Sequence, residues 1–295
     1  MRRTFWWLAL ALASALASCA PATPPPAGVL HVTVSILPQK YFVERVGGEH
    51  VRVEVMVGPG ANPATYEPKP EQLRALRRSR LYFRIGVPFE DAWMDKIASA
   101  NPQMRVVDTT QGIPRMPMAA HPGHGDEAQE QEGHNLDPHI WLSPRLVKVQ
   151  AQTIYQALAE ADPEHEADYR ANLEAFLADL DALDREIRDL LRGVSQRKFL
   201  VLHPSWGYFA RDYGLEMVPI EVGGQEPSAA ELAHLVRVAR EEGIRVVLAQ
   251  PEFSTRAAEV VAREIGGRVI LVSPLAEDWM ANLRHVARTL AEALK

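Results

Sequence analysis

A long amphipathic segment near the middle of the chain is the feature that most restricts how this sequence can fold. Asp162-Pro163 is typical of a helix start, and apolar residues then recur at steps of three and four until Gly193. About 30 residues of helix measure roughly 45 Å at 1.5 Å per residue, which is more than one small lobe requires. We therefore predict a rigid helix over residues 163–193 that joins two lobes, with a coiled-coil pairing as the alternative. The recurring apolar residues are Tyr169, Leu173, Phe176, Leu180, Leu183, Ile187 and Leu190.

The residues before this helix alternate between strand and helix patterns. Val51–Val57 reads V-R-V-E-V-M-V, and strict alternation of this kind is typical of a strand with one buried face. Strand–helix alternation at this spacing indicates βαβ units and a mostly parallel sheet, so residues 29–162 are expected to form an N-terminal α/β lobe. The other predicted strands are His31–Ile36, Leu81–Ile85 and Arg105–Asp108, and the predicted helices are Pro38–Val46, Pro70–Arg78 and Pro88–Ser99.

The residues after the long helix repeat this alternation and are expected to form a C-terminal α/β lobe over 194–295. Ser228 followed three residues later by Glu231 forms a capping-box pattern at the start of one helix. The predicted strands are Lys198–Leu202, Leu215–Ile220, Ile244–Ala249 and Arg268–Val272, and the predicted helices are Gly207–Tyr213, Ser228–Glu242, Ser254–Ile265 and Asp278–Leu294. The sequence thus predicts an α/β fold of two lobes joined by one long helix.

The N-terminus has the pattern of an export signal over residues 1–18. Arg2 and Arg3 precede an apolar run over 5–16, which is shorter than the roughly 20 residues of a membrane-spanning helix. Cys19, the only cysteine, follows Leu-Ala-Ser, and this pattern resembles the lipobox of bacterial lipoproteins, in which that cysteine is acylated. An ordinary secretion signal with an incidental cysteine is the alternative. With a stiff Pro-rich tether over 19–28, the pattern predicts an extracytoplasmic protein, lipid-anchored to the cell membrane on its periplasmic side or at the cell surface.

The charge of the chain argues against an anionic partner. Removal of residues 1–18 would take away two arginines and no acids, which moves the formal net charge from −6 to −8. A negative body of this kind does not favour nucleic acid as a partner, although it suits a protein that attracts cations. We expect a monomer.

A tract over residues 112–134 has no periodicity and few large apolar residues. It contains His121 and His124, ends next to His134, and carries four acidic residues between them. Such a tract cannot bury enough surface to fold independently, so we predict a mobile loop. Its imidazoles and carboxylates are potential accessory ligands for zinc, and a solvated acidic loop without a binding role is an equal alternative.

Two further histidines are the strongest candidates for a binding site. His139 lies between Pro138 and the bulky pair Ile140-Trp141, and His203 directly follows the predicted strand Lys198–Leu202. Ligands of open α/β sheets bind outside the carboxyl ends of strands, and neutral imidazole is the commonest protein ligand for transition metals. We therefore expect the first lobe to contribute His139 and the second His203 to a shared cleft. A buried structural histidine is the alternative at either position.

Signatures of catalysis are absent from the sequence. The chain has no H-E-x-x-H, no G-x-S-x-G and no Gly-rich phosphate loop followed by Lys, and the body has no cysteine for a thiolate nucleophile. His203 and Ser205 form only an H-x-S pair without a supporting motif. We predict that the protein is not an enzyme.

Taken together, the motifs resemble those of the zinc- and manganese-binding solute-binding lipoproteins of bacterial ABC uptake systems. The resemblance covers essentially the whole mature chain. It implies two pseudo-symmetric lobes of mostly parallel sheet flanked by helices, one long backbone helix, and a metal in the cleft for delivery to an ABC permease. It also favours zinc as the cargo, with manganese second, because the residue at the family's third ligand position is His203. The motifs are the lipobox, Gly58–Pro68 (G-P-G-A-N-P-A-T-Y-E-P), Asp137–Trp141 (D-P-H-I-W), His203–Phe209 (H-P-S-W-G-Y-F), Glu226–Ser228 and Pro251–Thr255 (P-E-F-S-T).

The chain departs from this family at two ligand positions. Ala64 stands where members usually have His, and Ser273 stands where they usually have Asp, so only His139 and His203 remain of the four usual ligands. Structural zinc sites favour four protein ligands and open sites three.

Three explanations for these departures remain open. Glu67 could supply a ligand, with a water at Ser273, although an acid before a helix is also favoured by the helix dipole. A histidine of the mobile loop could fold in. The cleft could instead take a non-metal small ligand. Outside the binding classes, a surface adhesion or scaffold lipoprotein is the remaining alternative.

Overall fold

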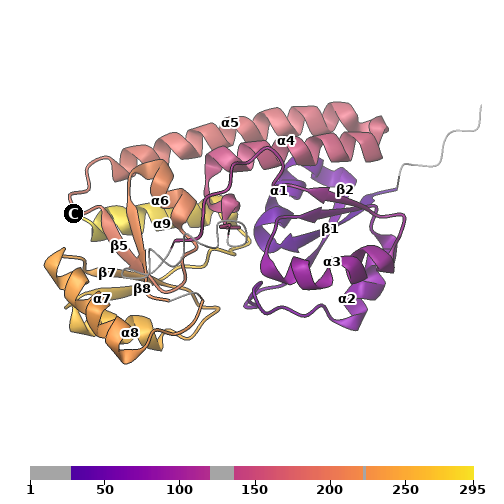
Figure 1. Cartoon of the computed structure of the whole chain (residues 1–295). Coiled ribbons are helices and arrows are strands. Elements are labelled where there is room, and N and C mark those ends of the chain that lie inside the picture. Colours follow the sequence, from indigo (N-terminus) through magenta and orange to yellow (C-terminus); the bar gives the residue numbers. More distant parts are fainter. Residues whose placement is uncertain (1–27, 120–135, 222–223) are drawn as a thin grey trace, which may run out of the picture.

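The fold consists of two parallel four-stranded sheets under a pair of long helices (Figure 1). It is given by a computed structural model that describes residues 28–119, 136–221 and 224–295. Within these ranges, no helix combines the length and apolar character needed to cross a membrane. The predicted signal peptide, Cys19 and nearly all of the tether lie outside the described residues.

The first sheet has the strand order β2-β1-β3-β4, and all of its strands are parallel. Val34 of β1 is in register with Val55 of β2 on one side and with Phe83 of β3 on the other. Each connection between strands contains a helix, as the alternating sequence pattern predicts. The elements are β1 (Leu30–Ile36), α1 (Leu37–Gly47), β2 (Val51–Val57), α2 (Pro70–Ala75), β3 (Leu81–Arg84), α3 (Pro88–Ala100) and β4 (Arg105–Asp108).

The second sheet repeats this arrangement with the order β6-β5-β7-β8, again all parallel. The repetition of strand order confirms two pseudo-symmetric lobes of parallel sheet. The elements are β5 (Lys198–Val201), α6 (Gly207–Tyr213), β6 (Glu216–Pro219), α7 (Ala229–Glu241), β7 (Val246–Ala249), α8 (Arg256–Glu264), β8 (Arg268–Leu271) and α9 (Trp279–Ala293).

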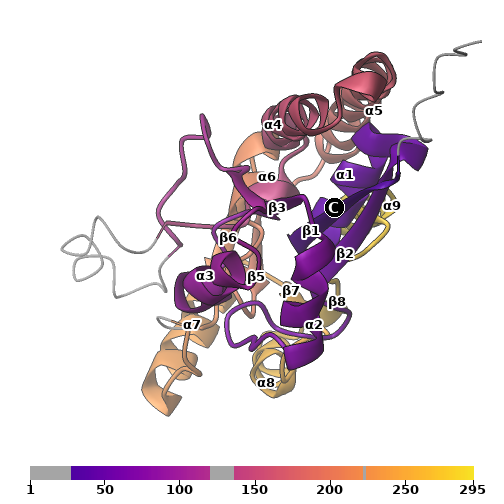
Figure 2. The same ribbon diagram turned by 90° about the vertical axis from the view of Figure 1, so that its right-hand side faces the viewer.

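The long helix α5 (Glu166–Leu191) packs against both lobes, and α4 (Pro144–Ala161) lies beside it (Figures 1 and 2). Asn172 of α5 donates a hydrogen bond to the carbonyl of Val46 in α1. Toward its other end, Glu186 of α5 pairs with Arg284 of α9. These contacts confirm a long helix that joins the lobes. The helix is shorter than predicted because Pro163–His165 forms a separate 3-10 turn before it.

The apolar face of α5 lies in the core of the molecule. Phe176 and Leu180 are fully buried, as are most of the predicted apolar positions. The same continuous core includes the first sheet, one face of the second sheet, and α9. A second, smaller core fills the opposite face of the second sheet, against α7 and α8. The shared core explains how one helix can hold both lobes in a fixed relation.

A buried carboxylate stabilises the turn after β3, which forms one wall of the cleft. Glu90 is fully buried and accepts hydrogen bonds from the Ser35 hydroxyl (2.5 Å) and from the backbone N–H groups of Ile85 (2.9 Å) and Gly86 (2.8 Å). Burial raises the pKa of Glu90, while these hydrogen bonds and the nearby Arg84 oppose the rise. Gly86 has a φ of 81°, which only glycine adopts without strain. The carboxylate therefore ties this turn to the lobe.

Replacement of this carboxylate by an amide should destabilise the protein. Glu90→Gln keeps one acceptor oxygen but turns an NH₂ group toward a backbone donor, which leaves a buried N–H unpaired. We expect a loss of about 1–3 kcal/mol in the free energy of unfolding, measured by urea denaturation. Glu71→Gln, on the exposed first turn of α2, is the matched control. Equal midpoints for the two variants would contradict this role.

Candidate metal site in the cleft

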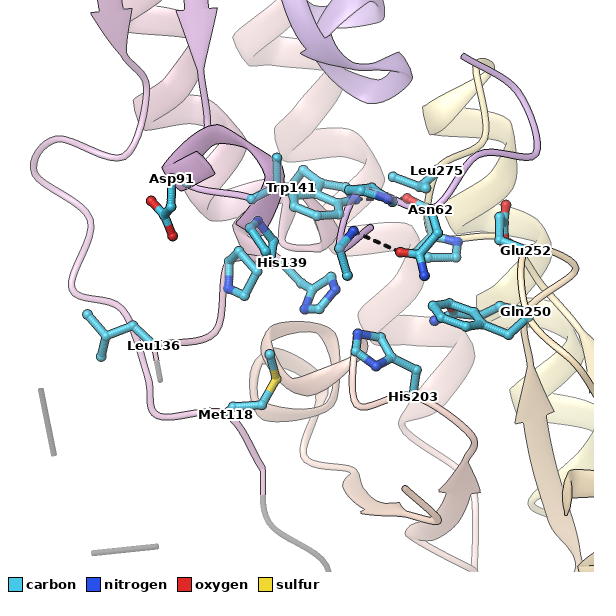
Figure 3. Close-up of a pocket in the computed structure, with 18 of the residues that line it drawn as sticks. Asn62, Asp91, Met118, Leu136, His139, Trp141, His203, Gln250, Glu252 and Leu275 are labelled. Carbon is cyan, nitrogen blue, oxygen red and sulfur yellow. Dashed lines mark hydrogen bonds between the residues drawn. The ribbon is translucent and has the colours of Figure 1, made fainter. Parts of the chain in front are cut away.

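A cavity of about 230 Å³ lies between the carboxyl ends of the two sheets (Figure 3). The first lobe contributes the loop after β2, with Asn62 and Ala64, and the turn after β3. The second lobe contributes His203 after β5 and the segment 250–253 after β7. Because β5 and β7 are neighbours in the sheet but not in the sequence, this is the point where the strand order reverses, and such points are the usual ligand sites of open α/β sheets.

His139 and His203 meet in this cavity. Their ring centroids are 5.3 Å apart with an angle of 70° between the planes. The Nδ1 atom of His139 lies 2.7 Å from Oδ1 of Asp137, and the Nδ1 atom of His203 lies 2.8 Å from Oε2 of Glu221. A carboxylate at Nδ1 favours the tautomer that has its proton there, which leaves the Nε2 lone pair free to bind a metal. Both rings thus have the outer-shell partner that is typical of metal-ligating histidines.

The surroundings of His139 favour its neutral form. Burial lowers the pKa of His139, and the nearby His203 adds to this effect, while Asp137 opposes it. The ring is only 7% exposed. A metal ligand must be unprotonated, so the buried environment keeps this imidazole ready for coordination.

The segment that contains His139 is attached to the second lobe, although its place in the sequence predicts the first. Trp141 donates from Nε1 to the carbonyl of Pro274 (2.8 Å), and Trp279 donates from Nε1 to the carbonyl of Trp141 (2.7 Å). Tyr208 donates to the carbonyl of Asp137 (3.0 Å). These long-range hydrogen bonds fix the histidine relative to α6, α9 and the segment after β8. The segment of His139 is therefore bound to the second lobe as well as to the first-lobe helices that α4 contacts, and the assignment of this ring to the first lobe stays a prediction.

Glu67, the remaining predicted ligand within the described residues, is not brought to the two rings. Glu67 is exposed and does not line the cavity, whereas Ala64 does. The end of the loop before α2 is not helical, so the proposed helical spacing between these two positions is absent. The role of Glu67 as a ligand stays a prediction without support from its position. His121, His124 and His134 lie outside the described residues.

No third protein ligand accompanies the pair in the described part of the chain. Residues 28–119, 136–221 and 224–295 contain no group of three or more His, Cys, Asp or Glu side chains placed to hold a metal ion. Ser273 donates a hydrogen bond to Glu252, and Glu252 lines the cavity on the side of the second lobe (Figure 3). The two imidazoles thus leave several coordination positions of a metal to other groups.

Two functional residues escaped the sequence analysis. Asp137 lies within the D-P-H-I-W motif, two residues before His139. This short spacing could have predicted a contact between the carboxylate and the ring. Glu221 is 18 residues from His203, on the strand end next to β5, and no short-range pattern links the two. Only the pairing of β5 with β6 brings this carboxylate to the ring.

Two parallel-sheet lobes around a cavity, with paired histidines at the strand ends, define a bilobed solute-binding protein. Residues 32–293 match the family model of "ZnuA: Zinc-uptake complex component A periplasmic". The chain therefore belongs to this family of periplasmic metal-uptake components, which confirms the resemblance drawn from its motifs. The family is one of transport binding proteins and not of enzymes.

Individual proteins show the same likeness along nearly the whole chain. A relative from Chlamydia trachomatis is 32% identical over 261 residues, which cover 88% of this chain and 90% of the relative. The high-affinity zinc uptake system protein ZnuA of Bacillus subtilis is 28% identical over 258 residues, covering 83% and 78% of the two chains. A crystal structure of ZnuA has a TM-score of 0.84 and 48% sequence identity, covering 90% of this chain and all of that one.

Proposed function

We propose that this protein captures a divalent transition metal, with zinc preferred over manganese, in the cleft and delivers it to an ABC permease without catalysing a reaction. The observation that carries the proposal is the pair of facing imidazoles, each held at Nδ1 by a carboxylate. Nitrogen ligands suit zinc better than manganese, which prefers more oxygen. The zinc-uptake names of the family and of the Bacillus subtilis relative support the same metal.

The proposal places the protein outside the cytoplasm as a lipid-anchored monomer. Family membership supports the periplasmic side of the membrane. The lipobox pattern at Cys19 supports acylation, and the Pro-rich residues that follow would serve as the tether. Mass spectrometry of the processed N-terminus would show an acylated Cys19, and an unmodified cysteine would contradict the anchor.

Calorimetry with the purified chain tests the function directly. Titration with zinc chloride should give a saturable heat for one ion, and manganese chloride should bind more weakly because the protein ligands are nitrogen atoms. Metal analysis of the freshly purified protein should find zinc. If neither metal gives a saturable heat, the metal-capture function is wrong.

The two carboxylates at Nδ1 should each contribute to zinc affinity. We expect Glu221→Gln and Asp137→Asn to weaken zinc binding by roughly 10- to 100-fold, because outer-shell partners orient the ligand and raise its basicity. Glu216→Gln, on the exposed side of β6, removes the same charge away from the cavity and is the control. Dissociation constants measured by competition with a zinc-selective dye would check this. Unchanged affinity in both variants would show that the carboxylates have no part in binding.

A further inference from the structure

The cavity is larger than one metal ion requires. A volume of about 230 Å³ corresponds to roughly eight water molecules, since one water takes up about 30 Å³ in the liquid. Of the 20 residues that line it, 11 have apolar side chains, among them Trp141, Phe253 and Leu275. A cavity that combines apolar walls with polar groups can hold an organic ligand. A bare ion would leave most of this space to water.

Two arginines line the cavity beside the turn after β3. Arg84 ends β3, and Arg115 follows β4 on the segment that returns toward the second lobe. The Nη1 atom of Arg115 would lie 2.9 Å from a Cβ atom at Gly86, so the glycine leaves the space that the guanidinium occupies. Among the described residues, Arg115 has no hydrogen-bond or ion-pair partner. Its donors are therefore not taken up by any other residue that the structure describes.

These arginines suit an anion and not a free cation. A guanidinium repels a divalent ion, whereas its paired N–H groups bind a carboxylate with two parallel hydrogen bonds. Arg84 is partly neutralised by Glu90, whose Oε2 lies 3.4 Å from Nε. Two acidic side chains also line the cavity: Asp91 is exposed on the first turn of α3, and Glu252 lies on the second-lobe wall, where it accepts from Ser273. Within residues 28–119, 136–221 and 224–295, no acid lies within ion-pair distance of the Arg115 guanidinium.

We propose that the metal enters as a chelate, already bound by a small polycarboxylate. In this arrangement His139 and His203 supply two nitrogen ligands through Nε2, the chelator fills the remaining coordination positions, and Arg115 binds one of its carboxylates. The proposal rests on the metal-capture function and names its substrate class. It accounts in one arrangement for the lack of a third described protein ligand, for the spare volume, and for a guanidinium without a partner among the described residues.

Zinc nitrilotriacetate is the probe that tests this proposal. Its tripodal tricarboxylate leaves room for two further ligands on an octahedral metal, which matches the two imidazoles. The purified whole chain is dialysed against radiolabelled zinc with radiolabelled nitrilotriacetate, and separately against zinc chloride. The wild-type protein should retain zinc and chelator in equal amounts. Arg115→Gln should bind the chelate about 10-fold more weakly, as expected for loss of a charge-assisted bidentate contact, and should bind zinc chloride no more weakly than wild type.

Arg115→Gln should lose affinity for the chelate but not for zinc chloride. This difference separates recognition of a carboxylate from a loss of folding, which would weaken binding of both probes. Arg52→Gln, an exposed arginine on β2, removes the same charge outside the cavity and should behave as wild type. If nitrilotriacetate only strips zinc from the protein, or if Arg115→Gln retains the chelate as well as wild type, the chelate proposal is overturned while metal capture stands. If neither zinc chloride nor the chelate is retained by wild type, both the chelate proposal and the metal-capture function are wrong.

Discussion

His139→Ala and His203→Ala are each expected to lower the affinity for zinc by more than roughly 100-fold. The two imidazoles are the only described ligand pair in the cavity, so either truncation leaves the metal with a single protein nitrogen. The loss in affinity should exceed the roughly 10- to 100-fold that removal of an outer-shell partner costs, because here the metal–ligand bond itself disappears. These variants should give the largest change in function of any single substitution in the chain.

Thermal unfolding measures this loss conveniently. At a free zinc concentration of 100 times the dissociation constant, binding stabilises the native wild-type protein by about 2.7 kcal/mol. For a chain of 295 residues that corresponds to a rise in Tm of roughly 4–5 °C. The two alanine variants should show almost no rise at the same zinc concentration.

His285→Ala is the matched control for these two variants. His285 is exposed on α9, away from the cleft, so this variant should respond to zinc as wild type does. A normal zinc-dependent rise in Tm for both His139→Ala and His203→Ala would place the metal elsewhere and remove the basis of the proposed function.

Trp141→Ala should produce the largest loss of stability. The indole is 1% exposed, donates to the carbonyl of Pro274, and has its own carbonyl held by Trp279. Truncation of a buried aromatic residue to alanine costs about 3–5 kcal/mol, and here it also removes a hydrogen bond between the segment of His139 and the second lobe. We expect a lower midpoint of urea unfolding together with weaker zinc binding.

A conservative variant separates packing from hydrogen bonding at this position. Trp141→Phe retains most of the apolar contact but leaves the Pro274 carbonyl without its donor, at a cost of about 1–3 kcal/mol. Trp93→Phe, at a half-buried position on α3, should cost less because no hydrogen bond of its indole is present in the described structure. If Trp141→Phe and Trp93→Phe have equal midpoints and equal zinc affinities, the reciprocal tryptophan contact has no role in holding the site.

The secondary structure and the fold class could be predicted because they depend on local patterns. The alternation of Val51–Val57 requires a strand with one inward face, and the three-and-four spacing of Tyr169 to Leu190 requires a helix with one buried stripe. Repeated strand–helix units then leave a parallel sheet as the arrangement that buries both faces. The strand boundaries differ from the predictions by one or two residues, as at Lys198–Val201, because the ends of elements are set by their neighbours.

The site was predictable only in part. His203 was found from its place after a strand, since the carboxyl ends of parallel strands lie at one edge of a sheet. His139 was found from its motif, but its attachment to the second lobe depends on hydrogen bonds to residues more than 130 positions away. The prediction that opposite lobes donate the two rings did not foresee this attachment, because sequence order does not show which surface a connecting segment packs on.

By itself, the sequence determined the secondary-structure elements, their order, the two-lobe class and the two candidate histidines. Each of these can be predicted from patterns among residues that are close together in the sequence. The tertiary structure alone decided that Glu221 supports His203, that Glu67 faces solvent away from the cavity, and that Arg115 enters the cleft beside Gly86. Those outcomes depend on how separate elements pack, and packing brings together side chains whose separation along the chain carries no signal of their distance in space.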